Sequence, residues 1–245
     1  MPPAFTYNPA MQMRSVRIIV VISLALCAAI SAASGQKREA TVPGLPGPFA
    51  WQNTPLRWES LASTAGQSAE SPGTSLIITA GKNTDWFVSP FGDGKTDASP
   101  RLLFTPAQDF VLSAKVRVDF RSTWDAGVLV VYAGERLWAK LCLEKTAEGH
   151  ASIVSVVTHD LSDDSTHFPV ASGAVYLQVA KAGQAIFFYA SEDGEKWTVV
   201  RAFTLGSVDG VRAGFSAQSP NGEQCTATFT QIRYAAQKIN LFAGK

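Results

Sequence analysis

The sequence has no excess of either charge. Its 21 basic and 20 acidic residues give a formal net charge of +1 over 245 residues, which argues against the basic surface that nucleic-acid binding requires. The sequence also lacks a phosphate-binding glycine loop, a dinucleotide fingerprint and the nucleophile elbow of serine hydrolases. Nucleic-acid partners and nucleotide chemistry are therefore not expected, and no cofactor is predicted.

Cysteine and histidine are scarce, with three residues of each. Cys27 lies in an apolar run near the N-terminus, and neither Cys142 nor Cys225 has a second cysteine or a histidine at metal-ligand spacing. No metal site is predicted. An oxidising compartment would allow Cys142 and Cys225 to pair if their strands were neighbours, and burial as small apolar residues is the alternative.

No stretch after residue 35 shows a sustained helical period. Instead, about a dozen short apolar or alternating runs, bounded by Gly, Asp, Ser or Pro, predict strands. Two polar stretches, residues 91–100 (FGDGKTDASP) and 162–168 (SDDSTHF), are predicted to be loops. We therefore expect an all-β protein with two packed antiparallel sheets, a β-sandwich.

The N-terminus has the order of a secretory signal peptide. Arg14 and Arg17 precede an apolar run at 18–30, and small residues follow at 31–35. Because the run is short for a membrane span, we expect cleavage near Ala33, with an uncleaved anchor as the alternative. The protein is then secreted, periplasmic or extracellular, and makes no membrane contact after signal removal. The predicted parts are a signal peptide (1–34), an extended leader (35–48), a sandwich (49–236) and a C-terminal tail (237–245).

Three consecutive strands are predicted at the centre of the chain, over residues 127–132, 137–144 and 153–158. Gly134 and Glu135 suit a two-residue type II′ turn between the first two strands, because that turn needs glycine at its first central position. This turn would pair Val131 with Trp138, Leu129 with Lys140, and Asp125 with Glu144.

The second of these strands places Trp138, Lys140, Cys142 and Glu144 on one face. An aromatic ring beside a cation and a carboxylate suits a sugar, whose C–H face stacks on the ring while its hydroxyls bond the charged groups. The alternative is an exposed sheet face with a distant Lys–Glu pair. The predicted ligand-binding residues are Trp86, Trp138, Lys140, Glu144, Thr158 and Asp163, with Trp86 as a second stacking platform.

Asp163 belongs to this set because strand 153–158 leaves the three-stranded unit beside Trp138. The loop that follows is therefore expected to border the ligand face, where Asp163 and Asp164 could accept sugar hydroxyls. In the alternative interpretation, Asp163 bonds backbone amides and only shapes the loop.

Asp125 and Glu144 are the candidate catalytic pair. Directly opposed Cβ atoms lie about 4.5–5.5 Å apart, and a retaining glycosidase needs carboxyl groups about 5–5.5 Å apart. The match depends on register, because a shift of one residue would place Trp124 opposite Glu144.

Residues 191–197 (SEDGEKW) place Asp-Gly between two predicted strands. In many carbohydrate-related β-folds, the Asp of such a hairpin bonds turn amides and the Trp packs beneath it. A well-made turn is the simpler interpretation, because Asp-Gly alone is sufficient cause for one.

Several sequence blocks, taken in order, resemble a known family: WQNTP, TDWF, WAKLCLE, SVVTHDLSDD, YASEDGEKW, VVRAF and GFSAQSPNGEQCTATF. The chain is similar over residues 49–234 to the YesU-like family, labelled domain of unknown function 1349, of which a fungal branch is named for regulation of enolase. The resemblance implies a concanavalin A-like lectin/glucanase sandwich of the jelly-roll type. It brings no established catalytic residue. The family usually shows an Arg-rich segment where this chain has LQVAK with Lys181, so a contact made by a bidentate Arg would be altered.

These features favour a secreted carbohydrate-recognising protein without established catalysis, whose partner is a glycan or oligosaccharide. A retaining glycoside hydrolase, or another carbohydrate-active enzyme using Asp125 and Glu144, is the alternative. An extracellular structural or interaction module is a further one.

Overall fold

The computed structural model describes residues 40–61, 74–207 and 209–244. The predicted signal peptide lies outside these residues, so secretion stays a prediction. The described residues form strands, turns and loops without a helix, and none of them therefore provides a helix that could cross a membrane.

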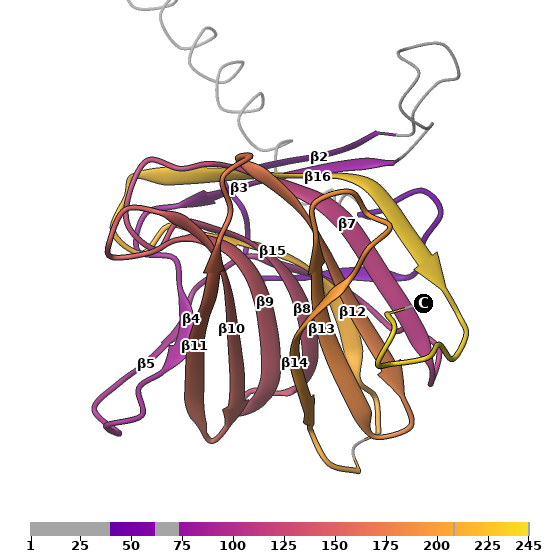
Figure 1. Cartoon of the computed structure of the whole chain (residues 1–245). Coiled ribbons are helices and arrows are strands. Elements are labelled where there is room, and N and C mark those ends of the chain that lie inside the picture. The colour runs from indigo at the N-terminus through magenta and orange to yellow at the C-terminus, as the bar shows by residue number, and fades with distance from the viewer. Residues whose placement is uncertain (1–39, 62–73, 208, 245) are drawn as a thin grey trace, which may run out of the picture. The chain divides into compact units, whose positions relative to one another are not determined.

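Two seven-stranded antiparallel sheets pack face to face and confirm the predicted sandwich (Figure 1). Sheet A contains, in spatial order, β1 (Phe49–Gln52), β6 (Arg101–Phe104), β15 (Arg212–Gln218), β8 (Ala126–Gly134), β9 (Leu137–Lys145), β10 (Ala151–His159) and β11 (Leu161–Pro169). Sheet B contains β14 (Thr198–Thr204), β13 (Ala185–Ser191), β12 (Ala174–Ala182), β7 (Phe110–Asp119), β16 (Gln224–Ala235), β3 (Ser75–Gly81) and β2 (Arg57–Leu61). A separate hairpin of β4 (Trp86–Val88) and β5 (Lys95–Asp97) projects on the left of Figure 1.

The main core lies between the two sheets. Leu129 and Leu141 of sheet A pack there with Val116 and Phe229 of sheet B, all fully buried. The sheets approach closely at Gly127, where an added Cβ would lie 2.8 Å from a methyl carbon of Val116. A larger residue at this position would therefore force the sheets apart.

Two regions predicted to be loops contain strands. The stretch 91–100 includes β5, which pairs with β4 through Trp86↔Asp97. The polar stretch 162–168 lies within β11, the edge strand of sheet A, which pairs with β10 along its length. An edge strand bonds its neighbour through its backbone and keeps much of its side-chain surface in water, so a polar sequence is compatible with it.

Both ends of the described chain pack onto the sandwich. Ala40 and Val42, from the predicted leader, are buried in the main core. Near the C-terminus, Ile239 and Leu241 pack against Phe187 and Tyr189 on the other side of sheet B.

Candidate functional site

The face of sheet A that points away from sheet B carries most of the predicted ligand residues, and we call it the outer face. Residues of β9 divide as predicted, because Leu141 and Leu143 lie in the main core whereas Trp138 and Cys142 lie in a second apolar cluster on the outer face. Strand pairing extends this face in rows, and one row runs through Gly214, Val130, Lys140, Val156 and Asp164.

Trp138 does not present an open ring to solvent. Trp86 of β4 stacks on it, with ring centroids 4.0 Å apart and ring planes inclined by 26°. The guanidinium carbon of Arg101 lies 4.1 Å from the centroid of the Trp86 ring. Both tryptophans are buried, so the two predicted stacking platforms serve here to hold the β4–β5 hairpin against the sheet.

Thr158 belongs to the same covered region. Its hydroxyl shares a hydrogen bond of 2.9 Å with the Ser162 hydroxyl, whose oxygen also accepts the Val88 N–H at 3.0 Å. Thr158 is fully buried, and its hydroxyl is already engaged in joining β10, β11 and β4.

Lys140 is the centre of a buried polar group. Its Nζ donates to Gln218 Oε1 at 3.0 Å and lies 3.5 Å from Asp85 Oδ1. The Gln218 Nε2 in turn donates to Glu144 Oε2 at 3.4 Å. Lys140 is 3% exposed and Glu144 is 7% exposed. We call Asp85, Lys140, Glu144, Asp164 and Gln218 the Lys140 cluster.

The charges of this cluster are coupled. Burial opposes the charged form of Lys140, but Asp85, supported by Glu144 and Asp164, outweighs it and raises the pKa of Lys140 above its usual value. Burial raises the pKa of Glu144 to about 8, although Lys140 partly opposes the shift. Burial also raises the pKa of Asp164, again against Lys140. Glu144 is therefore mainly protonated at neutral pH, and can donate a hydrogen bond as well as accept one.

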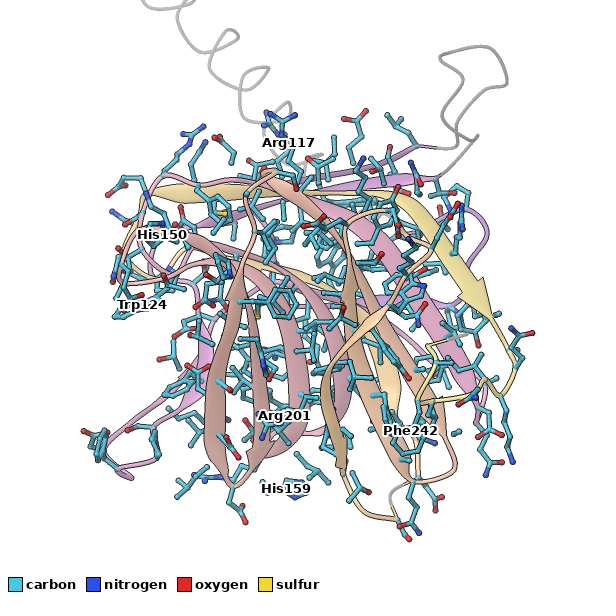
Figure 2. All side chains as sticks on the ribbon, viewed as in Figure 1. Arg117, Trp124, His150, His159, Arg201 and Phe242 are labelled. Atoms are coloured by element: carbon cyan, nitrogen blue, oxygen red, sulfur yellow. The ribbon has the colours of Figure 1, made fainter. Side chains whose placement is uncertain are left out.

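Trp124 lies at the end of the outer face where Glu144 is found. Gln218 Nε2 donates to the Trp124 carbonyl at 3.0 Å, and the Trp124 N–H donates to the Lys145 carbonyl at 2.6 Å. The Trp124 backbone has φ = +66°, which is unusual for a bulky residue and is often found at functional sites. Its side chain is 46% exposed, and Figure 2 shows it at the left rim of the sandwich, on the side of the β4–β5 hairpin.

The predicted pairing of Asp125 with Glu144 is wrong. A β-bulge between Tyr132 and Gly134 shifts the register by one residue, so that Ala126 lies opposite Glu144 and Val130 opposite Lys140. Asp125 is fully buried and its carboxylate is engaged: Oδ2 accepts the N–H groups of Arg121 and Ser122 at 2.8 Å, and Oδ1 accepts the Ser219 hydroxyl at 2.7 Å. These bonds give Asp125 a structural role at the start of β8.

Asp163 does not border the outer face as expected. It pairs with Val157, whose side chain lies in the main core, and its carboxylate lies 2.8 Å from Arg201 of β14. The neighbouring Asp164 pairs instead with Val156, which belongs to the outer-face cluster. Successive strand residues face opposite ways, so the change from loop to strand moves the ligand-facing role from Asp163 to Asp164.

Cys142 and Cys225 are both buried and unpaired. Cys142 lies on the outer face of sheet A and Cys225 lies in the main core, on the other side of that sheet. Sheet A therefore lies between the two thiols. Within the described ranges, no three His, Cys, Asp or Glu side chains are grouped so that they could hold a metal ion.

The family model described as protein of unknown function DUF1349 matches residues 51–237 of the chain. The chain belongs to the DUF1349 family. No curated protein matches its sequence.

Several solved structures have the same fold as this DUF1349 protein, although their sequence identity to it is low. A functionally unknown protein from Saccharomyces cerevisiae is 21% identical with a TM-score of 0.69, and the match covers 78% of this chain and 97% of that one. The GH43 protein BlXynB from Bacillus licheniformis, in its K247S form, is 18% identical with a TM-score of 0.54, over 66% of this chain and 33% of that one. An engineered GH43 glycoside hydrolase is 14% identical with a TM-score of 0.55, over 83% and 42%. The chain thus spans less than half the length of these GH43 proteins.

In this DUF1349 protein, sequence reasoning missed three residues of the outer face: Asp85, Gln218 and Trp124. Asp85 and Gln218 come from distant segments that reach Lys140 only through the fold. A signal was present, because both lie in blocks that carry the family resemblance, TDWF and GFSAQSPNG. Trp124 had no comparable signal, since a positive φ cannot be recognised from a tryptophan in the sequence.

Proposed function

We propose that this protein binds carbohydrate on the outer face of sheet A, at the Lys140 cluster and Trp124. The observation that carries the proposal is the fixed array formed by Lys140, Gln218 and Glu144 next to an exposed tryptophan held at φ = +66°. A strained backbone is retained only where its surroundings over-determine it. Two hydrogen bonds of the Trp124 backbone supply that constraint: its carbonyl accepts from the Gln218 amide, and its N–H donates to the Lys145 carbonyl.

The array suits the hydroxyl groups of a sugar. A hydroxyl both donates and accepts. Asp164 is exposed and Asp85 partly exposed, so these carboxylates are the members of the Lys140 cluster that a hydroxyl can reach from solvent. The buried Lys140, Gln218 and Glu144 form the hydrogen-bonded base that holds Asp85 and the Trp124 backbone. The half-exposed indole of Trp124 offers an apolar surface for the C–H face of a ring. Among the proteins with a similar fold are a GH43 glycoside hydrolase with endo-xylanase activity and a xylan β-1,4-xylosidase, which makes xylo-oligosaccharides the first ligands to test.

Replacing Trp124 with glycine should separate binding from stability. Glycine adopts a positive φ without strain, so we expect a free energy of unfolding within about 1 kcal/mol of the wild-type value. Loss of the indole should weaken oligosaccharide binding at least tenfold, or about 1.4 kcal/mol. Isothermal titration calorimetry with xylotetraose and other neutral plant oligosaccharides measures the binding, and urea unfolding measures the stability.

Phe242→Ala is the matched control. Phe242 is also an exposed aromatic residue, but it packs on Phe187 of sheet B, and Figure 2 shows it on the side of the sandwich away from Trp124. Its replacement should leave binding unchanged. The proposal fails if no oligosaccharide binds the wild type at millimolar concentration, or if Trp124→Gly binds as well as the wild type.

A second candidate function, carbohydrate hydrolysis, is favoured by one observation, the burial of Glu144, which raises the pKa of its carboxyl. A carboxyl with its pKa near 8 can act as a general acid at neutral pH. If the protein is a hydrolase, it should release reducing sugar from oligosaccharides, and Glu144→Gln should lower that rate at least a hundredfold while oligosaccharide binding persists. A wild type that releases no sugar from any bound oligosaccharide would leave binding as the function.

A further inference from the structure

The turn after β13 borders a cavity that the proposed carbohydrate site does not use. The cavity has a volume of about 420 Å³ and lies between this turn, the end of β11 and the start of β12. We call it the Asp193 pocket. None of the residues that line it belongs to the Lys140 cluster.

The floor of the Asp193 pocket is the open end of the main core. Val175 and Ala190 line it and are almost fully buried, and Phe168 and Val170 pack partly buried beside them. The pocket therefore has an apolar base that a ligand could cover, at the low end of the ~300–1,000 Å³ range of small-molecule sites.

The rim of the pocket is polar and rigid. Asp193 Oδ1 accepts the N–H groups of Glu195 and Lys196 at 2.8 Å and the Ser191 hydroxyl at 3.0 Å. The bonds from the Lys196 and Glu195 amides, with that from Ser191, lower the pKa of Asp193 to about 2, so the carboxylate stays charged at neutral pH. These contacts confirm the predicted turn.

The turn also leaves one carboxylate oxygen available. All three bonds go to Oδ1, and a carboxylate oxygen can accept further hydrogen bonds. Gly194 at φ = +76° packs against the ring of Tyr176, where an added Cβ would lie 3.0 Å from a ring carbon. The turn is thus fixed against β12, and its free acceptor is preorganised.

We propose that the Asp193 pocket is a second binding site, for a neutral mono- or disaccharide. The C–H face of the sugar covers Phe168 and Val170, while its hydroxyls bond the Asp193 carboxylate, the Lys196 ammonium and the Thr198 hydroxyl. Glu192, Asp193 and Lys196 at the rim carry a formal net charge of −1, from two carboxylates and one ammonium, which disfavours uronates. The site adds to the proposed function, and rests on it only for the choice of sugars as ligands.

Heteronuclear NMR of ¹⁵N-labelled protein tests this inference, with xylobiose, cellobiose and glucuronate as probes. The neutral disaccharides should shift the amides of residues 191–198, Phe168 and Val170, and glucuronate should shift them at least tenfold more weakly. Thr198→Phe, which fills the pocket from an exposed strand position, should abolish these shifts. Asp193→Asn keeps the Oδ1 acceptor that shapes the turn and should weaken binding about tenfold.

Trp124→Gly is the control that separates the two sites, because it should leave the shifts at the Asp193 pocket intact. Shifts confined to the surroundings of Trp124 and Gln218 would overturn the second site while supporting the proposed function. Shifts confined to the Asp193 pocket would support the second site and contradict the proposed function. Equal shifts with glucuronate, or pocket shifts that persist in Thr198→Phe, would also overturn the inference.

Discussion

Replacing Lys140 with methionine should lower the free energy of unfolding by about 3–5 kcal/mol at pH 7, because it leaves buried polar groups without their cation. Lys140 lies opposite Val130 on β8 and Val156 on β10. Methionine can keep the packing of the aliphatic stem between these residues. It cannot replace the ammonium that bonds Gln218 and faces Asp85.

Urea unfolding measures this loss, and Lys82→Met is the matched control. Lys82 is exposed and lies 3.8 Å from the exposed Glu223, so its replacement should cost less than about 1 kcal/mol. Adding Asp85→Asn to Lys140→Met should recover at least about 1 kcal/mol, because it removes one of the unpaired charges. A Lys140→Met protein as stable as the Lys82→Met control would contradict the view that Lys140 holds the cluster together.

The division of β9 into two faces could be predicted from the sequence, whereas its register could not. Strict alternation puts Leu141 inward and Lys140 outward in any pairing, because neighbouring strand residues face opposite ways. The register depends on the turn between β8 and β9, and the bulge between Tyr132 and Gly134 shifts it by one residue. Because of this one-residue shift in register, Asp125 does not lie opposite Glu144, and the two do not form the predicted catalytic pair.

The sequence also could not predict that the β4–β5 hairpin covers part of the outer face. An aromatic and charged strand face suggests a ligand whenever nothing else covers it, and only tertiary structure shows that Trp86 stacks on Trp138. Part of the outer face is consequently a second small core rather than a groove. The polar end, with Glu144, Gln218 and Trp124, is where the structure leaves an exposed aromatic side chain.

The protonation of Glu144 should make stability depend on pH between about 5 and 8. The folded protein holds the Glu144 proton up to a pKa of about 8, whereas the unfolded chain releases it near the ordinary value of 4.5. Between these values the folded state binds more protons than the unfolded state, so the free energy of unfolding falls as pH rises and levels off above about 8. At roughly 1.4 kcal/mol per pKa unit, the upper bound for this loss is about 5 kcal/mol.

Glu144→Gln should remove this dependence, because glutamine stays neutral and can keep the contact with Gln218. The variant should approach wild-type stability near pH 5 and exceed it by several kcal/mol at pH 8, in urea unfolding curves recorded at each pH. Taking the difference between the two proteins cancels, to first order, the titration of every group that they share. Glu59→Gln, on an exposed position of β2, should instead run parallel to the wild type. A Glu144→Gln curve that also runs parallel would mean that Glu144 is ionised in the folded protein, and would remove the basis for its role as a proton donor.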